Sequence, residues 1–272
     1  MTPIDARAAE RGLPAGLGSY LTQMFAVAYA EVVKLRHDPM DLVSRAVQPI
    51  LWLLLFGQVM AHVRVLAAAN GSYIDFLAPG VLAQSVLFVA IFYGLSAIWE
   101  RDLGVLHRYM VSPAPRSALV IGKALASSIR GLSQSVVIYV CAALLGVRLS
   151  LNPAHVLGVV ALVVLASALF STFSLIIACV VKTRERFMGI GQFLTMPIFF
   201  ASNAIYPVDM MPPWLRVIAR INPLSYEVDG LRDLMLAGGR SQLGLGLDYG
   251  VLAAVIVVLV VIATRMYPRL TQ

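Results

Sequence analysis

The sequence predicts an all-α membrane protein with six transmembrane helices. Of its 272 residues, 60% are hydrophobic and only 13% are charged, whereas soluble domains carry about 25% charged residues. Six runs of the chain contain no charged residue, and they match the roughly 17–25 residues that a span requires. The runs cover residues 46–63, 76–99, 131–147, 156–181, 187–208 and 249–264.

Unbroken apolar runs of this kind indicate helices. Backbone groups in lipid must form hydrogen bonds within the protein, which a helix achieves by itself. A membrane β-barrel would instead show alternating segments of about 10 residues. The third and sixth runs are the shortest, and we expect their helices to extend into the flanking residues. We expect a single domain, 1–272, with the six-span core at 41–267.

The N-terminal region has two parts. Residues 1–18 contain charges and lack the apolar segment of a signal peptide, so we expect them to be disordered and the first run to direct insertion. Residues 19–37 carry Leu21, Phe25, Val32 and Leu35 at helical spacing, which predicts an amphipathic helix in the membrane interface. The alternative is an ordinary cytoplasmic helix.

The distribution of positive charge predicts the orientation. Fourteen of the 21 Lys and Arg residues flank the runs on one side if the spans alternate, and six flank them on the other. This positive-inside bias places both termini in the cytoplasm, and we expect a bacterial cytoplasmic membrane. The positively charged side chains, which give the chain a net charge of +7, then contact the anionic headgroups of membrane lipids. We expect no nucleic-acid partner.

The region between the fifth and sixth runs predicts two short outer helices. Pro212-Pro213 can open the first, which carries Trp214, and Asn222-Pro223 ends it. Ser225 is the expected N-cap of the second, and Gly238-Gly239 is expected to end it. We expect both helices to rest on or dip into the outer interface as short re-entrant helices. The alternative is a loosely folded loop.

Catalytic and metal-binding patterns are missing from the sequence. It contains neither H-E-x-x-H nor G-x-S-x-G, and its four histidines lack metal-ligand spacing. Gly122-Lys123 resembles the end of a phosphate-binding loop, but Ser117 and Ala124 stand where that loop needs Gly and Ser or Thr. We therefore expect no catalytic site, no metal and no bound cofactor.

The polar residues inside the runs predict a pathway without charge. The runs hold no Asp or Glu, and ion-coupled carriers usually have such residues in their spans. Neutral side chains suit a large amphiphile or a neutral polar chain, and the alternative is that they only bond between helices. The candidate pathway residues are Gln84, Ser85, Tyr93, Gln192, Thr195 and Asn203.

Three segments resemble signatures of one family. They are "YIDFLAPGVLAQS" at 73–85, "WERDLGVLHRYMVSPAPRSALVIGK" at 99–123 and "AIYPVDMMPPWLRVIARINPLSYEVDGLR" at 204–232. In this order, after an interface helix, they resemble the membrane subunit of type-two ABC exporters. That family includes daunorubicin-resistance, nodulation-factor and capsular or teichoic-acid exporters, and the daunorubicin-resistance group is the most similar.

The resemblance implies an energy source outside this chain. Such permeases work as two copies, identical or paralogous, with two copies of a separate ABC ATPase subunit that binds ATP and Mg. A coupling helix after the second span contacts the ATPase, and the interface helix makes a second contact. The implied coupling residues are Glu100, Arg101, Asp102, Gly104, Leu106, Arg108 and Pro113, together with Lys34 and Arg36.

The outer signature implies a structural role for its matched residues, which are Pro207, Pro213, Trp214, Asn222, Pro223, Tyr226 and Arg232. Two positions in the coupling stretch depart from the family pattern. Asp102 replaces the usual Glu, and His107 stands where an acid is common, which alters the charge pairing there.

The expected function is export of a drug-like or amphiphilic, lipidic substrate by a permease that has no ATPase site of its own. Export of a polysaccharide or lipid-linked glycan is the first alternative, although aromatic residues make up only 9% of the chain and form no belt along one span. An ion-coupled secondary transporter and a membrane-embedded enzyme are disfavoured by the missing acids and the missing catalytic residues.

Overall fold

The computed structural model describes residues 29, 33, 47–57, 59, 73–104, 116–181 and 183–267. The expected disordered segment 1–18 lies outside this part of the chain. So does the expected interface helix 19–37, apart from Tyr29 and Val33, which are helical. The described part of the first run, residues 47–57 and 59, is helical and includes the π-helical turn η1, Trp52–Phe56.

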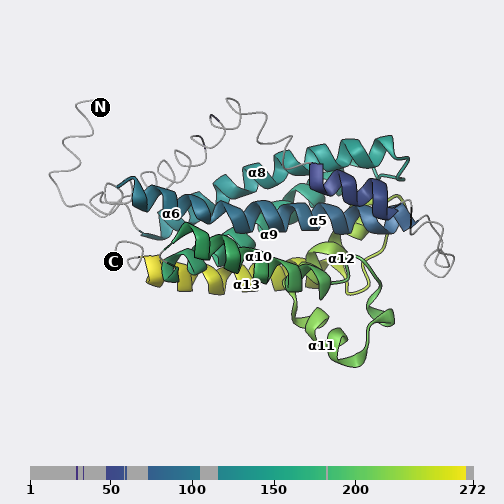
Figure 1. The fold of residues 1–272 in the computed structure, drawn as a ribbon. Coiled ribbons are helices and arrows are strands. Elements are labelled where there is room, and N and C mark those ends of the chain that lie inside the picture. Colours follow the sequence, from purple (N-terminus) through teal and green to yellow (C-terminus); the bar gives the residue numbers. More distant parts are fainter. Residues whose placement is uncertain are drawn as a thin grey trace.

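Long helices lie alongside one another and form a bundle (Figure 1). Its members are α5 (Tyr73–Tyr93), continued by α6 (Leu95–Asp102), then α8 (Arg116–Leu144), α9 (Pro153–Val180), α10 (Arg184–Phe200) and α13 (Leu245–Met266). Two short helices, α11 (Pro213–Ile221) and α12 (Pro223–Met235), lie at the end opposite α6 and the last turn of α13. The described residues form no strand and contain only the isolated bridge between Leu149 and Leu236.

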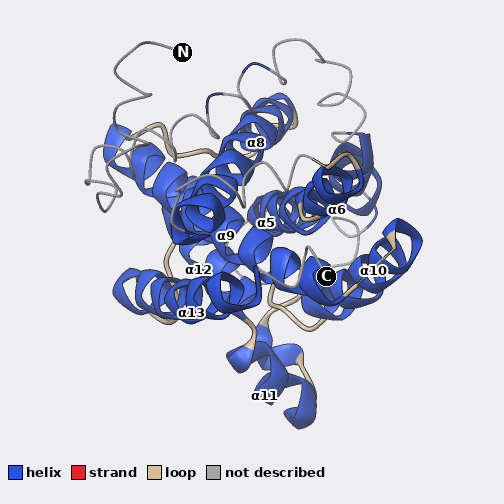
Figure 2. Ribbon diagram, turned by 90° about the vertical axis from the view of Figure 1, so that its left-hand side faces the viewer, coloured by secondary structure: helices blue, strands red, loops and turns tan. Residues whose placement is uncertain are grey.

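Helix α9 is the centre of the bundle, and α5, α8, α12 and α13 pack around it (Figure 2). It is rich in apolar residues on all sides, which is typical of a buried or membrane-spanning helix. Its start is determined locally, because Pro153 is its first residue and Asn152 Oδ1 accepts a hydrogen bond from Ala154 N at 3.0 Å. This is an ordinary N-cap arrangement.

Four helices in the described part of the chain are long and apolar enough to cross a membrane. They are Tyr73–Asp102, Ser117–Leu144, Pro153–Val180 and Leu245–Met266. The third run, 131–147, proves to be the second half of α8, which begins at Arg116 and has 29 residues. The expected extension of that helix is therefore confirmed, as is that of the sixth run, whose helix begins at Leu245.

The fifth run is a shorter helix than expected. The run ends at residue 208, but α10 ends at Phe200 after 17 residues, so the prediction of a span over 187–208 was wrong for its last eight residues. Pro197 lies in the final turn of α10, and proline disfavours continuation of a helix because it removes a backbone donor. Residues 201–207 then form a non-helical connection to the turn η2, Val208–Met210.

The two short helices between the fifth and sixth runs are confirmed, with one correction. Helix α12 begins at Pro223, and its N-cap is Asn222, whose Oδ1 accepts a hydrogen bond from Leu224 N at 3.0 Å. The prediction that Ser225 is the cap was wrong, because Ser225 lies inside the first turn with a buried hydroxyl that has no partner among the described residues. Helix α12 ends at Met235, ahead of Gly238.

The two short helices differ in burial. Helix α11 projects from the bundle (Figure 1), and Trp214 and Ile221 are 65% and 76% exposed. Helix α12 is buried and packs against α5, α9 and α13. Backbone hydrogen bonds from Ser150 N to Met235 O and from Ala237 N to Arg148 O, both 2.8 Å, attach its end to the loop between α8 and α9.

A break separates α5 from α6 at Gly94. Here α5 approaches α9 so closely that a Cβ atom on Gly94 would lie 2.0 Å from Ser174 Oγ. The Ser174 hydroxyl donates a hydrogen bond to Ile91 O across this contact, so only glycine fits. Because the break occurs eight residues before the end of Tyr73–Asp102, it determines the direction in which α6 carries the coupling motif.

Candidate functional site

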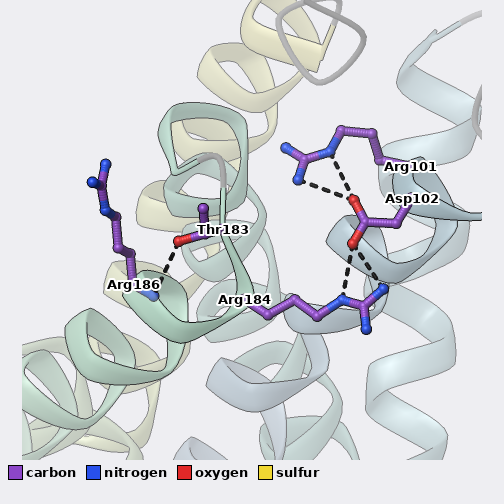
Figure 3. A network of polar contacts seen from close by, with 5 residues as sticks. All are labelled: Arg101, Asp102, Thr183, Arg184 and Arg186. Carbon is purple, nitrogen blue, oxygen red and sulfur yellow. Dashed lines mark hydrogen bonds and ion pairs between the residues drawn. The ribbon is translucent and has the colours of Figure 1, made fainter.

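Charged residues meet where α6 ends (Figure 3). We call Glu100, Arg101, Asp102, Lys123 and Arg184 the α6-end network. Asp102 accepts hydrogen bonds from Arg101 Nη2 at 3.2 Å and from Arg184 Nε at 2.9 Å. Glu100 Oε2 accepts one from Lys123 Nζ at 2.7 Å. The network therefore joins α6 to both α8 and α10.

Arg184 is positioned by its helix and by an aromatic ring. It is the first residue of α10, whose N-cap Thr183 accepts a hydrogen bond from Arg186 N at 3.4 Å. Its guanidinium lies 3.5 Å from the centre of the Trp99 ring, a favourable cation–π arrangement. Figure 3 shows the Arg186 side chain pointing away from Asp102.

The two acids of the network differ in burial. The side chains of Asp102 and Arg184 are each 34% exposed, and exposed ion pairs contribute only about 0–1 kcal/mol. The Lys123 side chain is 9% exposed and that of Glu100 24%, so their pair is more strongly shielded from water. The Glu100 pair therefore contributes more to holding α6 against its neighbours.

The coupling motif is described only in part. Its first three charged residues lie in the last turn of α6, which ends at Asp102, and Gly104 in the turn that follows has a φ of 69°. This left-handed conformation favours glycine. Leu106, Arg108 and Pro113 lie outside the described residues, as do Lys34 and Arg36. Sequence reasoning assigned neither Lys123 nor Arg184 to this site.

A second group of charged and polar residues lies on α12 and beside it, and its charged members are buried. We call Glu227, Asp229, Arg232, Ser241 and Asp248 the α12 cluster; the carboxyl groups come from α12 and from the first turn of α13. Asp229 Oδ2 accepts hydrogen bonds from Ser241 Oγ and Leu243 N, both at 2.9 Å. Ser241 Oγ also lies 2.9 Å from Asp248 Oδ2. Because a hydroxyl has one hydrogen, it can donate to only one carboxylate at a time.

Arg232 connects this cluster to α5. Its guanidinium lies 3.8 Å from the centre of the Phe76 ring and donates a hydrogen bond to Asn203 O. Burial lowers the pKa of Arg232 to about 10, while the nearby Asp229 carboxylate opposes this effect. The arginine of the outer signature is therefore a buried link between helices.

Glu227 has no partner among the described residues. It is fully buried, and neither carboxyl oxygen accepts or donates a hydrogen bond there. Leu234 packs on Gly158 and Gly230 faces Leu162, so Glu227 lies on the same α9-facing side of α12. Burial raises the pKa of its carboxyl well above the usual range, which favours the neutral acid at this position.

The α12 cluster changes one argument from the sequence. The six runs themselves contain no acid, but the bundle buries Glu227, Asp229 and Asp248. The absence of acids from the runs was therefore an incomplete argument against ion coupling. The motif Y-x-x-D-x-x-R contained a signal for Asp229, whereas Asp248 stands just before the last run.

The other residues of the outer signature have local structural roles. Asn222 Nδ2 donates to Ile198 O at 2.6 Å, and Tyr226 OH donates to Arg220 O at 2.6 Å. Pro207 precedes η2, and Pro213 and Pro223 are the first residues of α11 and α12. An apolar groove of about 630 Å³, the outer groove, lies between α11 and the end of α10. Its lining includes Pro197, Ile198, Phe200, Trp214 and Ile218.

Only some candidate pathway residues lie together. Gln84, Ser85 and Gln192 line a pocket of about 450 Å³, together with Gln48, Phe88 and Phe92. The remaining three lie elsewhere. Tyr93 lies under the Arg130 guanidinium, 5.5 Å from ring centre to Cζ. Thr195 donates to Gly191 O at 2.5 Å, and Asn203 contacts Arg232.

The long described helices are apolar and carry few charged residues, which defines a helical, multi-pass membrane protein. Within the described residues, no group of three or more His, Cys, Asp or Glu side chains is placed to hold a metal ion. The sequence profile of the ABC-2 type transporter family matches residues 22–236. The chain belongs to this family, whose members are membrane transport subunits that work with a separate ABC ATPase subunit.

Several proteins are similar to the chain over most of its length. The putative transport permease ycf38 of Cyanophora paradoxa is 28% identical over 218 residues, which are 79% of this chain and 74% of the relative. The daunorubicin resistance ABC transporter permease protein DrrB1 of Streptomyces coeruleorubidus is 25% identical, covering 85% of this chain and 81% of its own. Nodulation protein J of Rhizobium leguminosarum bv. trifolii is 27% identical, with coverages of 72% and 74%.

Proposed function

We propose that the chain is the permease subunit of an ATP-driven exporter that moves a drug-like or amphiphilic, lipidic substrate out across a bacterial cytoplasmic membrane. Two copies of the chain, or one copy and a paralogue, assemble with two ABC ATPase subunits, which bind the ATP and Mg. The chain itself binds no nucleotide, consistent with Ser117 and Ala124 in place of the residues of a phosphate-binding loop.

The observation that carries this proposal is the α6-end network. Glu100 is paired with Lys123 of α8, and Asp102 is paired with Arg184 of α10. A displacement applied where α6 ends is therefore transmitted to two further helices, as rigid-body coupling requires. The motif that resembles the ATPase-coupling signature is thus attached to elements that can carry motion into the membrane.

The proposed topology has six spans with both termini in the cytoplasm. The four long helices supply four spans, and the helical residues 47–57 and helix α10 supply two more. The α6-end network and the C-terminal end of α13 then face the cytoplasm, where the ATPase binds, and α11 and α12 face outward. Positive charges of the outer side, such as Arg148 and Arg240, lie at the α12 end.

The proposal can be tested with an ABC ATPase subunit that is isolated by co-purification with this chain. Inside-out vesicles that contain both proteins should take up a fluorescent amphiphile when ATP is added. Glu100→Ala should abolish uptake and leave membrane insertion intact. Transport by this chain alone, driven by a proton gradient, would show an ion-coupled carrier instead. The buried acids of the α12 cluster are the observation that favours this second candidate. ATP-dependent export of a lipid-linked glycan but of no small amphiphile would support the polysaccharide alternative.

A further inference from the structure

The pocket that contains Gln84 lies near the middle of the longest apolar helix. We call it the glutamine pocket. Its walls come from Gln48 and Pro49, from residues 84–95 of α5 and α6, and from Gln192 of α10. The helix Tyr73–Asp102 has 30 residues, and Gln84 is 11 residues from its start. The volume of about 450 Å³ is within the usual range of roughly 300–1,000 Å³ for small-molecule sites.

The lining of the pocket combines amides with aromatic rings. Gln48, Gln84 and Gln192 come from three separate elements, and Phe88 and Phe92 lie on one face of α5 with ring centres 6.1 Å apart. None of the lining residues that the structure describes is charged. A charged ligand group buried here would have no counter-charge, which is strongly unfavourable. An uncharged group would meet amide donors, amide acceptors and apolar surface.

Gln84 is the residue that most directly indicates a ligand. It is 3% exposed, and its Oε1 has no hydrogen-bond partner among the described residues. A buried acceptor without a partner is unfavourable, and a donor from a ligand removes that cost. Ser85 is different, because its hydroxyl already donates to Val81 O at 2.8 Å. The unmet acceptor therefore belongs to the amide.

We propose that the glutamine pocket binds the uncharged part of an amphiphile, with a ring system on Phe88 and Phe92 and a hydrogen-bond donor on Gln84 Oε1. This inference rests on the proposed function, since it names the substrate class of that transport pathway. The glutamine pocket should bind neutral amphiphiles more tightly than cationic ones of the same shape. It also selects ligands with hydrogen-bonding groups over hydrocarbons of the same size.

The test compares two fluorescent probes that differ in one charge. N-acetyldaunorubicin and daunorubicin share a ring system and a sugar, but the first carries an amide where the second carries an ammonium group. Their binding to the purified full chain in lipid nanodiscs is measured by equilibrium dialysis, and empty nanodiscs correct for partition into lipid. We expect saturable binding of the acetylated probe and at least roughly tenfold weaker binding of the cation, which corresponds to about 1.4 kcal/mol.

Variants then locate the site. Gln84→Met keeps the length of the side chain and removes the amide, and we expect it to weaken binding of the acetylated probe roughly fivefold to tenfold. Gln192→Met should weaken it as well, and the double variant should lose more than either. Gln134→Met is the matched control, because Gln134 is a buried glutamine of α8 that does not line the pocket. Size-exclusion profiles establish that each variant is folded.

Several results would overturn the proposal. They are equal binding of both probes, no saturable binding of the acetylated probe to the wild type, or equal losses in the Gln84 and Gln134 variants. The measurement needs neither ATP nor the ATPase. Failure of binding alongside ATP-driven transport would therefore refute only the pocket, whereas specific binding without ATPase association would refute only the proposed transport mechanism.

Discussion

Glu100 and Lys123 should be energetically coupled. Removal of the Glu100 side chain and removal of the Lys123 charge should both destabilise the protein, but by different amounts. The two charges lie 2.7 Å apart, which gives a Coulomb energy of about 6 kcal/mol at an effective dielectric constant of 20 and about 1.5 kcal/mol in water. Desolvation offsets most of this energy. We therefore expect a net coupling free energy of about 1–3 kcal/mol.

The asymmetry follows from burial. Glu100→Ala leaves the Lys123 ammonium, whose side chain is only 9% exposed, without a counter-charge, whereas Lys123→Met leaves the more exposed Glu100. We expect losses of about 2–3 kcal/mol and about 1–2 kcal/mol respectively. For a chain of this size they correspond to decreases in apparent Tm of roughly 4–9 °C and 2–6 °C.

A double-mutant cycle measures this coupling. Thermal unfolding of the purified protein is followed with a thiol-reactive dye for the wild type, both single variants and Glu100→Ala/Lys123→Met. The double variant should be more stable than Glu100→Ala alone, because no unpaired charge remains buried. If the two single effects add to within about 0.5 kcal/mol, the ion pair does not hold α6 to α8 and the reasoning is refuted.

Three further predictions follow from other contacts. Arg184→Ala should lower the free energy of unfolding by at most about 1 kcal/mol but reduce substrate-stimulated ATP hydrolysis of the complex. The Arg186 side chain points away from Asp102, so Arg186→Ala should leave hydrolysis unchanged, and equal effects of the two variants would contradict the network. Asn222→Ala should lower the free energy of unfolding by about 1–2 kcal/mol, because the N-cap bond and the bond to Ile198 O are lost, whereas Ser225→Ala should be neutral; the reverse order would restore Ser225 as the cap. Glu227→Gln should be more stable than the wild type at pH 8 and equally stable near pH 4. The folded-state pKa of Glu227 is raised, so the wild type loses stability as the pH rises above the unfolded-state pKa of about 4.3, whereas the glutamine variant does not. A stability difference that does not change with pH would refute this.

Local signals in the sequence predicted the outer helices well. Pro213 and Pro223 begin α11 and α12 because proline at a first helical position loses no hydrogen bond. The cap was misassigned because Asn222 and Ser225 are both good cap residues, and the choice depends on Pro223, which can only follow the cap. Pattern alone did not distinguish between two acceptable caps three residues apart.

Distant contacts were beyond the reach of the sequence pattern. Lys123 is 23 residues from Glu100, and Arg184 is 82 residues from Asp102, so no periodicity relates them. The same limitation explains why the third uncharged run, 131–147, covered only the second half of α8. Lys123 and Arg130 interrupt the apolar run, but the fold gives them Glu100 and the Tyr93 ring as partners. A search for uncharged residues cannot recognise a charge that the protein itself neutralises.

Helix α10 contacts the bundle along a narrow stripe. Its buried residues are Phe187, Gly191, Thr195 and Phe199, each four residues from the next, and its other residues are exposed or half-buried. Its first residue, Arg184, is bonded to Asp102, its middle supplies Gln192 to the glutamine pocket, and its last turn lines the outer groove. A small roll of this one helix about its stripe would therefore change the volumes of two cavities at different depths at the same time.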